Sequence, residues 1–188
     1  MATHPRIAKQ IHQPFQSGND RVLKAMNRHY DREPYLKKVA YAKSVMPGLV
    51  LTSDVIVGFP GETEEEFEET LTLIQQVHYD SLFTFIFTPR AGTPAASMED
   101  PTTKEEKNRR FDRLCALQNS ISEQIHRDYV GKTMRCLVDG RDKDMLTART
   151  EGGRLVRFAG DDSLIGSFRD LTITGATTWS LTGVLPNN

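Results

Sequence analysis

The first half of the chain alternates between strand-like and helix-like hydrophobic patterns. Residues 7–15 predict a short strand ending near Pro14, and 81–88 predict another. Between them, the apolar, β-branched run at 49–57 is typical of a strand covered on both faces. Strands that alternate with helices indicate parallel pairing with right-handed crossovers. Because the pattern provides too few strands to close a barrel, we expect part of a larger α/β sheet.

Capping residues mark the starts of the expected helices. Ser17 or Asn19, and later Asp31, precede apolar residues at helical spacing, and their side chains can accept the free N–H groups of a first turn. Thr63 and Glu66 form the pattern of a capping box. A single long helix is then expected from Thr102 to about Tyr129, with a buried stripe made of Phe111, Leu114, Leu117, Ile121 and Ile125.

The pattern changes after Gly131 to short strands separated by turn residues. The expected strands are residues 134–138, 145–150, 154–158, 171–174 and 178–185. Short strands at this spacing predict a small β-barrel. We therefore expect two domains, 1–127 and 128–188, with an α/β fold followed by a small all-β barrel.

The composition of the chain is that of an ordinary soluble protein. Its 188 residues include 24 lysines and arginines against 25 aspartates and glutamates, so no global field favours a nucleic-acid partner. No apolar run approaches the ~20 residues of a membrane span, and the start lacks an apolar signal core. We expect a cytoplasmic protein with no membrane association. Cys115 and Cys136 are expected to be reduced thiols, and neither they nor the histidines have metal-ligand spacing.

Three polar residues stand at the ends of expected elements: Gln16, Arg28 and Asp54. Arginine can hold a carboxylate with two hydrogen bonds, aspartate can accept from an ammonium or from ribose hydroxyls, and glutamine can do either. Together they suit a small zwitterionic nucleoside at the carboxyl ends of parallel strands. An ordinary ion pair between Arg28 and Asp54 is an equally good interpretation of the residues alone.

Three blocks of sequence resemble the radical S-adenosylmethionine (SAM) methylthiotransferases that modify tRNA. They are IHQPFQSGNDRVLKAMNRHY from Ile11, DVIVGFPGETE from Asp54 and FIFTPRAGTPA from Phe85. The resemblance implies the C-terminal half of a radical SAM partial (β/α) barrel. It also implies that SAM is bound by Gln16, Arg28, Asp54, Ile56 and Gly58, with Arg28 on the methionine carboxylate.

The family also holds two 4Fe–4S clusters, whose cysteine motifs are absent from this chain. Iron–sulfur clusters need thiolate ligands. The resemblance therefore implies the C-terminal portion of an enzyme, with no catalytic or metal-binding residue of its own. We expect it to be inactive alone and to need the N-terminal part of the same enzyme as a partner.

Residues from Gly131 to Leu185 resemble a TRAM domain, a small barrel that binds RNA. Arg149, Arg154 and Arg157 are expected to neutralise phosphates, and Phe158 or Trp179 to stack on a base. The implied partner is the anticodon stem-loop of tRNA.

The resemblance as a whole implies addition of a methylthio group to carbon 2 of the modified adenosine next to the anticodon. The ending that begins at Trp179 favours tRNA over the ribosomal-protein substrate of the sister methylthiotransferase. A second hypothesis from a different class is a non-catalytic RNA-binding module whose α/β half is only a scaffold.

Overall fold

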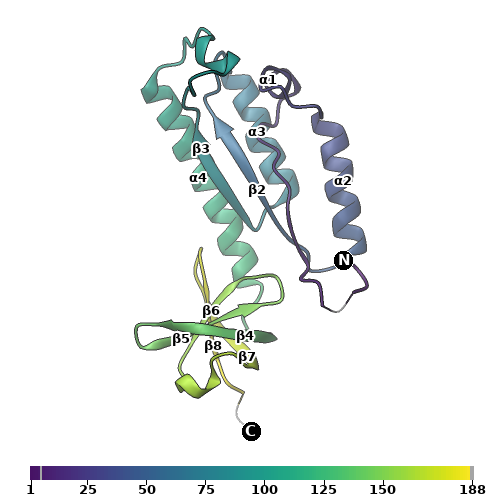
Figure 1. The fold of residues 1–188 in the computed structure, drawn as a ribbon, viewed down its shortest axis with the longest axis vertical. Coiled ribbons are helices and arrows are strands. Elements are labelled where there is room, and N and C mark those ends of the chain that lie inside the picture. Colours follow the sequence, from purple (N-terminus) through teal and green to yellow (C-terminus); the bar gives the residue numbers. More distant parts are fainter. Residues whose placement is uncertain (5, 187–188) are drawn as a thin grey trace. The chain divides into compact units, whose positions relative to one another are not determined.

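A computed structural model describes residues 1–4 and 6–186, which form two compact units (Figure 1). The α/β unit comprises Ile11–Pro47 and Leu51–Asn119, and the barrel unit comprises Met1–Gln10, Gly48–Val50 and Ser120–Asn188. The domain boundary near residue 128 stays a prediction. Among the described residues, no helix is long and apolar enough to cross a membrane.

The α/β unit is built on a three-stranded sheet in the order β1-β2-β3. β2 and β3 run parallel, with Asp54 opposite Phe83 and Ile56 opposite Phe85. The strands are β1 (Gln10–His12), β2 (Val50–Val57) and β3 (Ser81–Ile86). The helices are α1 (Asp20–Ala25), α2 (Arg32–Val45), α3 (Glu64–Val77) and α4 (Lys104–Arg127), with a short 3-10 turn, η1, at Pro94–Ser97.

The helices begin largely where their capping residues predict. Asn19 accepts a hydrogen bond from the backbone of Val22 and starts α1, and Thr63 with Glu66 forms the expected capping box of α3. Asp31 precedes α2 but makes no side-chain capping bond. The carboxylate of Asp20 instead accepts from the backbone N–H of Arg32 at 2.7 Å. A residue of the preceding helix thus supplies the cap that Asp31 was expected to provide.

The sheet is covered on one face and partly open on the other. Leu51, Val55 and Val57 have no exposed surface, so the face they share is packed. Phe83 and Phe85 are 56% and 52% exposed. The expectation that the second strand is covered on both faces holds in part: on this face of β2, Val50 and Thr52 are buried, while Asp54 and Ile56 are half-buried. Successive side chains of a strand project to opposite faces, and here only one face meets the apolar side chains of the helices.

The buried stripe of α4 is more polar than expected. Leu114 and Ile121 are buried, whereas Phe111, Leu117 and Ile125 are only partly so. Lys107, Arg110, Gln118, Ser122 and His126 are also buried on this helix. The buried face of α4 therefore differs from the expected apolar stripe and includes several polar side chains.

The barrel unit contains a closed barrel of five strands, in the order β4-β5-β6-β8-β7. This confirms the predicted small barrel. The strands are β4 (Thr133–Asp142), β5 (Met145–Thr150), β6 (Leu155–Phe158), β7 (Phe168–Ala176) and β8 (Leu181–Val184), with a 3-10 turn, η2, at Asp162–Leu164. Alternate residues point inward and form one apolar core: Cys136, Val138, Leu146, Ala148, Val156, Phe158, Leu171, Ile173 and Leu181.

Candidate functional site

Gln16 follows β1 and is held against β2 by its backbone. Its N–H donates to the carbonyl of Asp54 at 3.0 Å, and its carbonyl accepts from Ile56 at 2.9 Å. Its φ of 63° lies in the left-handed region, which is unfavourable for a non-glycine residue. Gln16 is only 6% exposed. A strained backbone at a buried polar residue is typical of a functional position.

Asp54 lies on the open face of the sheet. Its Oδ1 is 3.4 Å from Nε2 of His12, and the other ring nitrogen of His12 is 2.9 Å from Oγ1 of Thr52. The His12 ring also meets Phe83 edge-on, with centroids 5.7 Å apart. Among the described residues Asp54 forms no ion pair with Arg28, so the simple ion-pair interpretation is not supported by the structure.

Arg28 is exposed and stands just after α1. Its backbone N–H donates to the carbonyl of Leu23 at 2.9 Å, and the preceding Asn27 has a φ of 57°. Burial raises the pKa of Tyr30, and the charge of Arg28 opposes that rise. The Tyr30 hydroxyl donates to the carbonyl of Phe15 at 3.2 Å. Arg28 is therefore placed near the segment that leads into Gln16, although among the described residues it forms no hydrogen bond or ion pair with Gln16 or Asp54.

Gly58 ends β2 in a left-handed conformation, with a φ of 71°. Its N–H donates to Oε2 of Glu62 at 2.7 Å. A Cβ at this position would stand 2.6 Å from Cγ of Lys107. The glycine is therefore required by the packing of Lys107, and a ligand would have to contact its carbonyl or its Cα. Ile56 is half-buried on the same face as Asp54.

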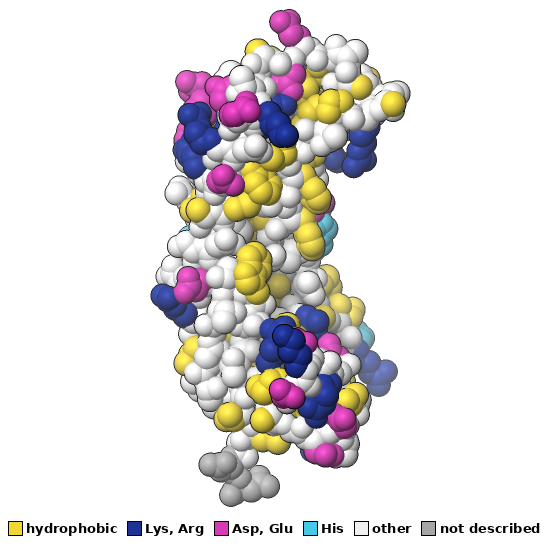
Figure 2. Space-filling model, turned by 90° about the vertical axis from the view of Figure 1, so that its left-hand side faces the viewer, with side chains coloured by type: hydrophobic (Ala, Val, Ile, Leu, Met, Phe, Trp, Pro, Cys, Tyr) yellow, Lys and Arg dark blue, Asp and Glu magenta, His cyan; other side chains and the backbone are white. Residues whose placement is uncertain are grey.

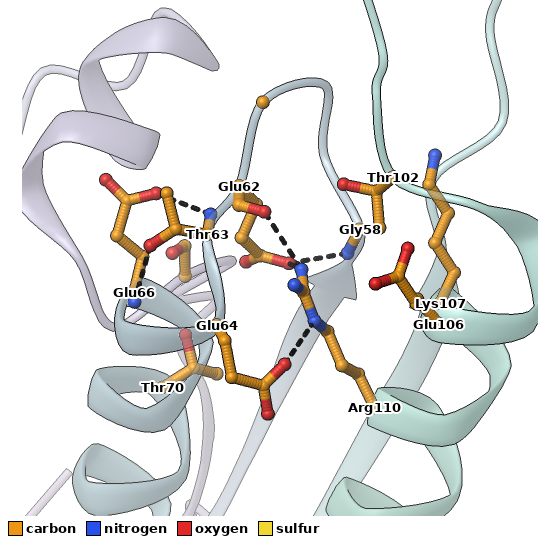
Figure 3. A network of polar contacts seen from close by, with 12 residues as sticks. Gly58, Glu62, Thr63, Glu64, Glu66, Thr70, Thr102, Glu106, Lys107 and Arg110 are labelled. Atoms are coloured by element: carbon orange, nitrogen blue, oxygen red, sulfur yellow. Dashed lines mark hydrogen bonds and ion pairs between the residues drawn. The ribbon is translucent and has the colours of Figure 1, made fainter.

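Glu62 is a buried acid that sequence reasoning missed (Figure 3). It is only 3% exposed. Its backbone carbonyl accepts a hydrogen bond from Nη1 of Arg110 at 2.9 Å. The Nε of Arg110 donates to the carboxylate of Glu64, also at 2.9 Å. Oε1 of Glu62 has no hydrogen-bond partner within the described residues. Burial raises the pKa of Glu62 to about 7, against the lowering effects of the Gly58 N–H and of Arg110. The sequence signal that could have found Glu62 is its position between the glycine turn and the capping box of α3.

The two cofactor types implied by the sequence fit these residues differently. The amide of Gln16, the exposed guanidinium of Arg28 and the partly exposed carboxylate of Asp54 are groups that suit SAM. For a cluster, the described residues offer no group of three or more His, Cys, Asp or Glu placed to hold a metal. Cys115 and Cys136 are free, and burial raises the pKa of Cys136 to about 11. These residues do not fit an iron–sulfur cluster.

The arginines expected to contact phosphates are placed unequally on the barrel. Arg149 is half-exposed and its Nε donates to Asp139 at 2.9 Å, while Arg157 is paired with Asp142 at 3.1 Å. Both side chains are accessible, but each forms an ion pair with an aspartate. Arg154 is only 9% exposed, and its guanidinium lies 4.5 Å from the centroid of the Tyr129 ring.

The two candidate stacking residues also differ. Phe158 has no exposed surface because it points into the barrel core, as Val156 does on the same strand. Its ring is not accessible to a base and Arg154 is buried, so the structure supports neither residue as an RNA contact. Trp179 is 71% exposed in the turn between β7 and β8, where the N–H of Thr177 donates to the carbonyl of Ser180. Sequence reasoning missed a second exposed aromatic residue, Phe168, because its position depends on strand register.

Comparisons with known proteins identify two segments of the chain. Residues 5–74 match the Radical SAM superfamily, and residues 127–185 match the TRAM domain. A solved structure, that of coproporphyrinogen III oxidase from Escherichia coli, described as a radical SAM enzyme, resembles 60% of this chain and 27% of its own. Its TM-score is 0.52 at 21% identity, which supports the fold alone.

Curated relatives match nearly the whole chain. A tRNA-2-methylthio-N(6)-dimethylallyladenosine synthase of Clostridium botulinum is 48% identical over 95% of this chain and 40% of its own length. Proteins of the same name from Acetivibrio thermocellus and Desulfitobacterium hafniense are 45% and 46% identical, with 38% and 42% of their lengths covered. The chain thus spans about two fifths of the relatives that it matches.

Proposed function

We propose, from its matches to the Radical SAM superfamily, the TRAM domain and curated tRNA-2-methylthio-N(6)-dimethylallyladenosine synthases, that this chain is the C-terminal portion of a tRNA methylthiotransferase. The whole enzyme would add a methylthio group to carbon 2 of the modified adenosine next to the anticodon. Its iron–sulfur clusters would be held by residues outside this chain, since those described here do not fit a cluster. The portion itself is expected to be inactive without the N-terminal part of the enzyme. We place the boundary between its two domains near residue 128.

The observation that carries the proposal is the buried, strained Gln16 bonded through its backbone to Asp54. In the proposed site Arg28 holds the carboxylate of SAM, Asp54 accepts from its ammonium or ribose hydroxyls, and the Gln16 amide completes the polar contacts. Ile56 and the carbonyl side of Gly58 would face the adenosine part. Bound SAM would supply the methyl group and the adenosyl group of the reaction.

The barrel is proposed to bind the anticodon stem-loop of tRNA. The exposed Trp179 and the half-exposed Arg149 and Arg157 support this role. Phosphate contacts by arginine give binding that weakens as salt is raised. The alternative substrate is a ribosomal protein, as in the sister enzymes, and binding of that protein in place of the stem-loop would support it.

Isothermal titration with S-adenosylhomocysteine tests the cofactor site in this chain. We expect weak binding that Arg28→Ala reduces by about 10- to 100-fold, since a charge-assisted hydrogen bond contributes about 1.5–3 kcal/mol. Lys37→Ala provides the control, because Lys37 is exposed and pairs with Glu33. Absence of binding at millimolar ligand would contradict the proposed cofactor site.

A non-catalytic RNA-binding module is the second candidate. It is favoured by one observation, that Lys107 and Glu62 already occupy two sides of Gly58. RNA binding by the chain without any binding of S-adenosylhomocysteine would support this alternative.

A further inference from the structure

One outer surface of the barrel combines arginines with exposed apolar side chains. We call it the Arg135–Phe168 face. It borders a cavity of about 700 Å³, whose lining includes Arg6, Arg135, Leu137, Arg149, Glu151 and Phe168. In Figure 2, basic and hydrophobic side chains lie close together on the barrel, with acidic side chains among them. The inference below rests on the proposed RNA-binding function and specifies where and how the RNA is bound.

Strand register brings the members of this face together. Leu137 of β4 is aligned with Arg149 of β5 on one side and with Phe168 of β7 on the other. The neighbours of Leu137 on β4, Cys136 and Val138, have no exposed surface and point into the core. Because side chains alternate along a strand, Leu137 and the residues aligned with it point outward.

The aromatic ring of this face is accessible and already stacked with a cation. The Arg135 guanidinium lies 4.7 Å from the centroid of the Phe168 ring. Phe168 is 57% exposed and Leu137 is 37% exposed. A guanidinium over a phenyl ring is an attractive arrangement that orders both side chains. The pair therefore presents an ordered planar group at the surface.

Arginines outnumber acids among the residues that line the cavity. Three arginines and one acid, Glu151, are among its lining residues. Arg149 forms an ion pair with Asp139. Asp170 of β7 is aligned with Arg135 of β4. Arg6 forms no ion pair within the described part of the chain. The cavity thus combines an aromatic surface with cations that can meet phosphates.

We propose that the Arg135–Phe168 face binds an unpaired nucleotide of a single-stranded RNA segment. The base stacks on Phe168 beside Arg135, while Arg149 and Arg6 neutralise the flanking phosphates. A base inside a duplex is stacked between its neighbours and cannot reach the ring, whereas loop bases can be splayed out. The face therefore selects the loop of a stem-loop rather than its stem.

Fluorescence anisotropy of the full chain with two labelled RNAs tests this proposal. The probes are a tRNA anticodon stem-loop and a blunt duplex of the same length. Phe168→Ala is expected to weaken stem-loop binding by about 5- to 100-fold, because stacking on an aromatic side chain contributes strongly for each base. The slope of affinity against salt should stay unchanged, since no phosphate contact is lost. Arg149→Ala should lower that slope by about 1.

Matched variants separate the possible outcomes. Phe168→Tyr should keep the affinity of the native chain, and because Phe168 is exposed the melting temperature of Phe168→Ala should stay close to native. Unchanged stem-loop binding by Phe168→Ala, with loss in Trp179→Ala, would overturn this face but leave RNA binding by the barrel intact. No RNA binding by the native chain would overturn both proposals. Equal loss of duplex and stem-loop binding in Phe168→Ala would also contradict recognition of an unpaired base.

Discussion

Gly58 and Glu62 are joined by a hydrogen bond of 2.7 Å from the backbone N–H of the glycine to Oε2 of the acid. The bond closes the turn between β2 and α3. Arg110 of α4 donates to the Glu62 carbonyl of the same turn at 2.9 Å (Figure 3). A helix distant in sequence is thus tied to the turn beside the proposed SAM site, which makes the turn a useful place to test the structure.

The stability of the chain should depend on pH through Glu62. Burial raises the pKa of Glu62 from 4.5 to about 7 in the folded state. The folded chain therefore holds the proton more tightly than the unfolded chain does. The resulting stabilisation is fully present below about pH 4.5 and is lost as the pH rises through about 7. We expect a loss of order 1–3 kcal/mol in unfolding free energy between pH 5 and pH 8.

Urea denaturation of Glu62→Gln at both pH values checks this assignment. The glutamine can still accept from the Gly58 N–H but does not titrate, so the pH-dependent loss should largely disappear. Glu33→Gln is the control, because Glu33 is exposed and pairs with Lys37. A Glu62→Gln variant that keeps the native pH profile would show that another group is responsible.

Gly58→Ala should destabilise the chain more than Gly61→Ala does. Both glycines are left-handed, with φ of 71° and 74°, so both substitutions carry the ~1–2 kcal/mol cost of that conformation. Only at Gly58 would the new Cβ meet Lys107, at 2.6 Å, while at Gly61 nothing lies within 4 Å. We expect an additional cost of about 1–3 kcal/mol at Gly58, measured by chemical denaturation. Equal costs would mean that the Lys107 side chain moves away freely.

Substitutions of Gln16 should separate backbone strain from ligand binding. Its φ of 63° suits glycine better than alanine, so Gln16→Gly should be more stable than Gln16→Ala by about 1 kcal/mol. Thermal unfolding measures the difference between the two. Both variants should lose affinity for S-adenosylhomocysteine equally if the side-chain amide contacts the ligand. A glycine variant that binds as the native chain does would remove Gln16 from the proposed site.

Phe158 and Arg154 should affect the stability of the barrel rather than its contacts with RNA. Phe158 is fully buried, and Phe158→Ala should cost about 3–5 kcal/mol of unfolding free energy. Arg154→Met should also destabilise the barrel, since the guanidinium is buried over Tyr129. The salt dependence of RNA binding by folded Arg154→Met should equal that of the native chain. A lower salt slope would restore Arg154 as a phosphate contact.

Local sequence signals were sufficient for most elements of the fold. The capping box at Thr63 and Glu66 acts within one helical turn, and the short barrel strands are bounded by their own turn residues. Such signals need only near neighbours in the chain. The family resemblance was likewise carried by continuous blocks, such as the one that begins at Asp54, and the comparisons confirm it.

The sequence by itself thus determined the order of the elements, the barrel and the family resemblance, because these depend on local patterns and continuous motifs. Only the tertiary structure decided which side chains are accessible. Arg157 faces outward and Phe158 inward because neighbouring residues of a strand point to opposite faces. Gly58 packs against Lys107, and Phe168 packs against Arg135. The two residues of each pair are distant in the chain. Such pairs are set by packing and strand register, which no local pattern records.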